Sequence, residues 1–161
     1  MPVWLKRLPT RQMLRLRKTA RRVLLFALCQ VVVIFVRLAL YVVKFSRIQK
    51  MLTSQRATNH KNEARAFIIA RNVQKAARFV PNASCLTQAL SAQAVLSWFG
   101  VPTEMVLGAS KSNADPRLLS GRPGTDFHAW LTWKGQVILG GEELETQTFV
   151  PLSRFPTIET G

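Results

Sequence analysis

Two long apolar patterns dominate the first half of the chain, and both predict helices. Residues 23–43 are apolar except for Cys29, Gln30 and Arg37, and this length suits a buried helix or a membrane span. Farther along, apolar side chains recur at the three- and four-residue spacing of one helix face, namely Ala66, Ile69, Ala70, Val73, Ala76, Ala77 and Val80. This second helix should stop before Pro81, because proline cannot continue it.

A further helix is predicted directly after Pro81, with Asn82 or Ser84 as its N-cap. Helical spacing places six of its side chains on one face, namely Cys85, Leu86, Ala89, Leu90, Gln93 and Leu96. Gly100 followed by Pro102 predicts where it ends.

The second half of the chain has the two-residue alternation of strands. Residues 103–109 predict one strand, and a loop rich in Ser, Asn, Asp, Pro and Gly follows at residues 110–125. Residues 127–133 and 136–139 predict two more strands, joined by a tight turn at Lys134 and Gly135. Helices followed by a small antiparallel sheet indicate the α+β class.

Charge divides the chain into two parts. The 161 residues are 48% apolar, enough for a real core, and the net charge is +15. Residues 1–60 contain thirteen Lys and Arg and no acidic residue, whereas residues 61–161 are close to neutral. We therefore expect a basic, apolar helical segment over residues 1–60, a polar linker near residues 53–62, and a globular domain over residues 61–161. Nucleic-acid binding is not expected, because the basic residues are interleaved with an apolar helix that has few aromatics.

The apolar N-terminal helix has two interpretations. Gln30, Arg37 and Lys44 are seven residues apart and form one narrow polar stripe. That stripe favours a helix packed on protein or lying in a membrane interface, since Arg37 in the middle of a span would cost about 2.5–3.5 kcal/mol. A true span remains the alternative, and the basic flank would then keep the N-terminus inside the cell. We expect a cytoplasmic protein with membrane contact through residues 1–50, in association with the inner membrane.

Cysteine and histidine are the residues best suited to chemistry. Cys29 and Cys85 lack the spacing of a metal site, and a disulfide between them has no motivation in a chain with so few cysteines. Cys85 falls in the first turn of a predicted helix, where the helix dipole lowers a thiol pKa. Of the two histidines, His60 lies in the polar linker and His128 in a predicted strand. Cys85 and His128 therefore predict a nucleophile and its base, although both also fit as core residues of a non-catalytic, membrane-associated scaffold.

Several motifs, in order, resemble the leader-peptidase domain of lasso peptide maturation. They are Ala83–Leu90 with its Cys-Leu pair, Gly100-Val101-Pro102, Val106-Leu107-Gly108, and His128-Ala129-Trp130. The resemblance covers residues 64–152. It implies a papain- or transglutaminase-like core in which Cys85 and His128 cleave the leader from a ribosomally made precursor peptide, without a cofactor. It also implies an ATP-dependent lasso cyclase and a separate leader-recognition protein as partners. The enzymatic rival is acyl transfer to an amine by the same Cys–His pair.

The chain departs from this family at the third catalytic position. The family places an Asp about twelve residues after its His, where this chain has Gly140 and Gly141. We expect Glu142 to orient the imidazole instead. Three alternatives remain open. Glu143 or Asp126 could orient the imidazole, or no third residue does so and the glutamates after Gly141 are only a solvent-exposed run.

Overall fold

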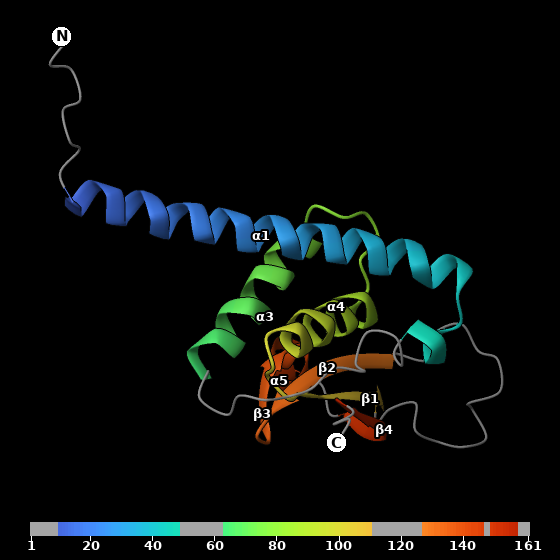
Figure 1. Ribbon diagram of the computed structural model, residues 1–161. Helices are drawn as coiled ribbons and strands as arrows, with labels where there is room; N and C mark the ends of the chain where they lie inside the picture. Colours follow the sequence, from blue (N-terminus) through green and yellow to red (C-terminus); the bar gives the residue numbers. More distant parts are fainter. Residues whose placement is uncertain (1–9, 49–62, 111–126, 147–148, 158–161) are drawn as a thin grey trace, which may run out of the picture.

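The computed structural model of the protein describes residues 10–48, 63–110, 127–146 and 149–157. Three helices lie in two layers over one small sheet, with α1 outermost (Figure 1). The helices are α1 (Thr10–Val42), α3 (Glu63–Ala77) and α4 (Cys85–Trp98). The sheet is antiparallel in the order β3-β2-β1-β4, which confirms the α+β class, and its strands are β1 (Glu104–Ser110), β2 (Phe127–Trp133), β3 (Gln136–Leu139) and β4 (Phe149–Pro156).

The inner faces of α1 and α3 form the upper part of the core. The apolar pattern of α3 is confirmed, because Ala66, Ile69, Ala70, Val73, Ala76 and Ala77 are all buried. Helix α1 contributes Cys29, Val32, Val33 and Val36, each at most 5% exposed. This four-residue stripe packs on α3 and α4, so the middle of α1 shares the core of the domain. The predicted linker and the loop at residues 111–126 lie outside the described residues.

Helix α4 is the central helix, and its two ends follow from local sequence. Ser84 is the N-cap: its Oγ accepts a hydrogen bond from the backbone N–H of Thr87 at 3.3 Å, an interaction that stabilises a helix by about 1 kcal/mol. At the other end, Gly100 adopts φ +69° and the Val101 N–H donates to the Leu96 carbonyl. This is a Schellman motif, which confirms the predicted helix end. Between the caps α4 is buried all round from Ala89 to Ser97 rather than on one face.

The buried amide of Gln93 connects α4 to the sheet. Its Nε2 donates hydrogen bonds to the Phe155 carbonyl of β4 at 2.8 Å and to the Thr103 carbonyl, next to β1, at 3.4 Å. Gln93 is 0% exposed. The amide therefore fixes the middle of α4 against two neighbouring segments of the sheet.

The hairpin between β2 and β3 has the predicted two-residue turn. Lys134 and Gly135 adopt φ +48° and +78°, the left-handed values of a type I′ turn. Strand β3 ends at Leu139, and α5 (Gly141–Thr146) begins directly after Gly140. The predicted end of the strand at residue 139 is confirmed, and Glu142 and Glu143 follow in a short helix.

Candidate active site

Cys85 is the first residue of α4, and its side chain is half-buried at the edge of the sheet. Its thiol lies 3.8 Å from the Phe127 carbonyl at the start of β2. In the first helical turn the backbone N–H groups have no helical carbonyl to bond. Ser84 Oγ accepts one of them, at Thr87, and the Ser84 carbonyl accepts that of Gln88. The N–H groups of Cys85 and Leu86 begin the same turn, and that of Leu86 is one of the groups that lower the pKa of the thiol.

His128 lies on β2, one of the two central strands, and is 3% exposed. Its ring stacks on Trp130, two residues along the same strand, with centroids 6.0 Å apart. The Phe149 ring of β4 lies 5.2 Å away on a tilted plane. Two aromatic rings therefore limit the orientations of the imidazole.

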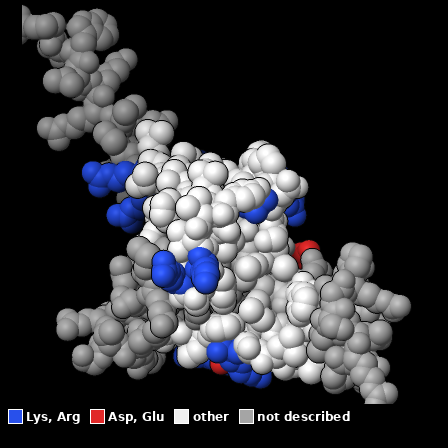
Figure 2. Space-filling view, turned by 90° about the vertical axis from the view of Figure 1, so that its right-hand side faces the viewer, with Lys and Arg blue, Asp and Glu red and all other residues white. Residues whose placement is uncertain are grey.

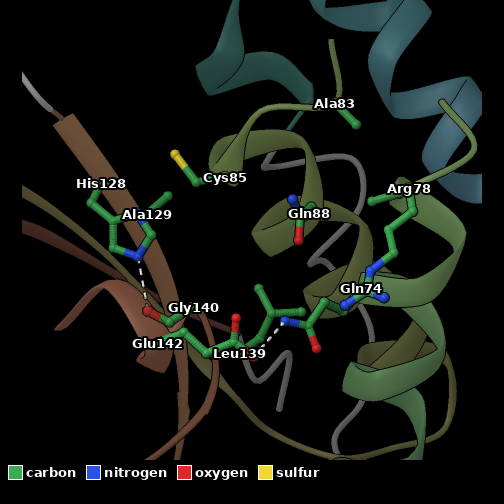
Figure 3. A pocket seen from close by; sticks show the side chains of 11 residues that line it. Gln74, Arg78, Ala83, Cys85, Gln88, His128, Ala129, Leu139, Gly140 and Glu142 are labelled. Carbon is green, nitrogen blue, oxygen red and sulfur yellow. Dashed lines mark hydrogen bonds between the residues drawn. The ribbon is translucent and has the colours of Figure 1, made fainter. Parts of the chain in front are cut away.

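A backbone carbonyl accepts the hydrogen bond of the His128 ring. The Nε2–H of His128 donates to the Gly140 carbonyl at 2.9 Å (Figure 3). In the neutral ring this leaves Nδ1 as the basic nitrogen, and Nδ1 is buried. The imidazole is thus held in the tautomer that can accept a proton from the thiol.

Glu142 does not occupy the position expected for a third catalytic residue. Its carboxylate accepts a 3.4 Å hydrogen bond from Gln74 of α3, while Gly140 bonds to the imidazole. The chain turns sharply at Gly140. The Gly140 carbonyl therefore reaches the imidazole, and the Glu142 side chain, two residues later, does not take that place. Of the other candidates, Asp126 and the Glu143 side chain lie outside the described residues.

A cavity of about 400 Å³ opens between the helices and the sheet in front of the two residues. Figure 3 shows the Cys85 sulfur and the His128 ring along the same wall. Gln74 and Arg78 of α3 lie across the cavity from them, and the chain around Gly140 lines it below the His128 ring, with Leu139 and Glu142 (Figure 3). This volume lies within the range of small-molecule and peptide sites.

The two cysteines have opposite electrostatic surroundings. Burial, the largest single influence, raises the pKa of the Cys85 thiol, and hydrogen bonding to His128 and to the Ala129 backbone lowers it. The charge of the His128 ring and the Leu86 N–H act in the same direction, so the pKa lies below its usual value. For Cys29, burial raises the pKa to about 11. Cys85 is therefore the more readily ionised of the two thiols, and Cys29 stays protonated at neutral pH.

We expect iodoacetamide to label Cys85 selectively in the folded protein at neutral pH. The pKa of Cys85 is lowered, so its thiolate persists to lower pH than that of a free cysteine, whereas Cys29 is protonated and buried. Peptide mass spectrometry after timed labelling measures both rates. His128→Ala should slow the labelling of Cys85 and shift its pH profile upward. Labelling of Cys85 no faster in the folded than in the unfolded chain would contradict the lowered pKa of its thiol.

Three cavity residues were not singled out by the sequence. Gln74 and Arg78 are four residues apart on α3, and Gln88 follows Cys85 by one turn. Their helical spacing is a signal that could have identified them once the two helices were predicted. Gly140 is different, because it contributes a carbonyl, and a backbone group carries no residue-type signal.

Comparison with known proteins gives one match. The sequence model of the family described as the transglutaminase-like superfamily matches residues 29–154. No curated protein and no solved structure matches the chain. The matched range begins within α1 and ends in β4, so it includes the helices, the sheet and both Cys85 and His128.

Proposed function

The chain belongs to the transglutaminase-like superfamily, whose domains are typical of cysteine hydrolases and transferases, and on that basis we propose that it is a cysteine peptidase. Its proposed reaction is removal of the leader from a ribosomally made, lasso-type precursor peptide. The observation that carries the proposal is the pairing of the Cys85 thiol, at a helix start, with the buried His128 ring beside a cavity. The order of motifs from Cys85-Leu86 to His128-Ala129-Trp130 supports the choice of substrate.

The proposed mechanism begins with proton transfer from the Cys85 thiol to Nδ1 of His128. The thiolate attacks the scissile carbonyl carbon, a C–S bond forms, and the carbonyl π electrons move onto oxygen. The N–H groups of Cys85 and Leu86 lie where they can stabilise that oxyanion. The imidazolium then gives its proton to the leaving nitrogen as the C–N bond breaks.

Hydrolysis completes the cycle. The neutral imidazole removes a proton from water, and the oxygen of water attacks the thioester carbon. The C–S bond then breaks, the leader leaves with a free carboxylate, and the thiol is restored. Throughout, the Gly140 carbonyl holds the Nε2 proton and favours the charged ring when Nδ1 is protonated.

The walls of the cavity fit a polar main chain better than an apolar ligand. Gln74 and Gln88 offer amide donors and acceptors, and Arg78 and Glu142 add one charge of each sign. An extended peptide can hydrogen-bond to such groups through its own amides. The proposed partners are the precursor peptide, a separate leader-recognition protein and an ATP-dependent lasso cyclase, acting in the cytoplasm.

The test uses the purified full chain with a lasso-type precursor peptide and a separate leader-recognition protein from the same source. We expect mass spectrometry to detect two products, a leader with a free carboxylate and a core peptide with a free N-terminus. A primary amine added in excess distinguishes the two reactions of this superfamily. An amide adduct of the leader in place of the free acid would show acyl transfer and reject the peptidase, and an intact precursor would reject both.

A further inference from the structure

Helix α1 has a second apolar face, opposite the one that packs on the domain. We define its outer apolar face by six exposed side chains, Leu24, Val31, Ile34, Phe35, Leu38 and Val42. Their exposed fractions run from 42% to 86%. They recur at helical spacing along α1, and Figure 1 shows that this helix lies outermost, away from the sheet. Monomeric soluble proteins rarely expose so long an apolar stripe without a partner.

Basic side chains accompany this face. Arg15, Arg17, Lys18, Arg21 and Arg22 occupy the N-terminal turns of α1 and are all exposed. Residues 1–60 contain thirteen Lys and Arg and no acidic residue. Figure 2 shows the molecule from the C-terminal end of α1. In this view the basic side chains are separated from one another by a largely uncharged surface. A partner should therefore combine an apolar interior with negative charge.

The border of the outer apolar face also has the composition of a membrane interface. Arg37 donates a 2.6 Å hydrogen bond to the Tyr41 hydroxyl, and its guanidinium lies 4.4 Å from the centre of the Tyr41 ring. Tyrosine and arginine are amphipathic side chains that place their polar ends at headgroup level while their apolar parts stay below. Tyr41 is 68% exposed, so its ring faces outward, and Arg37 beside it is partly buried.

We propose that the outer apolar face of α1 binds the surface of an anionic lipid bilayer, with the helix lying in the membrane plane. The segment Arg15–Val42 is long enough to span a bilayer, with a mean hydropathy of 2.7 in its most apolar window. A span would remove Cys29, Val33 and Val36 from the core that they share with α3 and α4. The in-plane arrangement keeps that core intact and needs no rearrangement. This inference does not depend on the proposed peptidase reaction.

The test is flotation of the full chain with lipid vesicles. We expect binding to vesicles of phosphatidylglycerol and phosphatidylethanolamine and much weaker binding to phosphatidylcholine alone. High salt should weaken the binding by screening the basic residues. The double variant Phe35→Gln/Leu38→Gln should lower the vesicle partition coefficient by about tenfold or more, because two large apolar side chains no longer enter the bilayer.

Leu152→Gln is the matched control. Leu152 is 55% exposed on β4, on a different part of the surface, and its loss should leave vesicle binding unchanged. Circular dichroism and thermal unfolding of each variant show whether the fold is retained. Alkaline carbonate should release the bound protein, because an in-plane helix is extractable and a spanning helix is not.

Three results would overturn the proposal. One is equal binding to anionic and neutral vesicles, or binding to neither. Another is carbonate resistance, which would show a span. The third is a homodimer in analytical ultracentrifugation that the double variant dissociates without any vesicle binding, which would make the outer apolar face a contact between two copies.

Discussion

Cys85→Ala is expected to lower the rate of leader cleavage by about 10⁴ to 10⁶, the range of losses for removing a member of a catalytic nucleophile–base unit. The variant keeps the cavity and the helix-start N–H groups but has no sulfur to attack the carbonyl. His128→Ala should cause a loss of similar size. The double variant should be no worse than either single variant, because the two groups act as one unit. Initial rates of product formation measured by mass spectrometry give all three values.

The other cysteine provides the control for this experiment. Cys29→Ala makes the same chemical change at a buried thiol of α1 whose pKa is raised to about 11. It should keep its activity and lose only a little stability, because a small cavity opens in the core. Losses at Cys85 and His128 that simply add up, or a Cys85→Ala enzyme that still cleaves at an unchanged rate, would contradict a nucleophile–base pair.

Gly140→Ala should damage both stability and catalysis. Gly140 has φ +80°, where an L side chain is strained by about 1–2 kcal/mol. An added Cβ would lie 3.1 Å from Nε2 of His128 and 3.0 Å from the Trp130 Cβ. We expect a Tm lower by roughly 5 °C and a kcat lower by about a hundredfold, because the carbonyl that holds Nε2 must move. Thermal unfolding and single-turnover kinetics measure the two effects separately.

Gly135→Ala separates backbone strain from the contact with the imidazole. Gly135 has φ +78°, nearly the same as Gly140, but an added Cβ there meets no atom within 4 Å. The variant should lose a similar amount of stability and keep its kcat. Equal activities of the two variants would show that the Gly140 carbonyl does not position His128.

The helices and the hairpin could be predicted because each depends on local sequence. The pattern of α3, the cap at Ser84 and the turn at Lys134-Gly135 involve residues that are neighbours along the chain. Cys85 and His128 were paired from their residue types and predicted elements, and family resemblance strengthened the pairing, since forty-three positions separate them and no local rule brings them together. Strand β4 was not predicted: it includes Pro151 and Pro156, which disfavour a strand interior but fit the edge of a sheet.

The partner of the imidazole could not be predicted by searching for acidic side chains. Three carboxylates, those of Glu142, Glu143 and Asp126, were candidates, whereas Nε2 donates its hydrogen bond to a main-chain carbonyl. Every residue has such a carbonyl, and only the fold determines which one reaches the ring. Gly140 and Gly141 at that position were the one indication of this arrangement in the sequence, because Gly140 allows a turn that a side chain would hinder.

The buried amide of Gln93 links the chemistry to a distant edge of the sheet. Gln93 lies two turns beyond Cys85 on α4, about 12 Å along the helix axis, and it bonds to the Phe155 carbonyl of β4. Rotation of α4 about its axis would break this bond. The direction in which the Cys85 sulfur points therefore depends on β4, an edge strand to which none of the described cavity-lining residues belongs. Among the described strands only β1 pairs with β4, and pairing of another chain with the outer edge of β4 would therefore shift the nucleophile through a rigid helix.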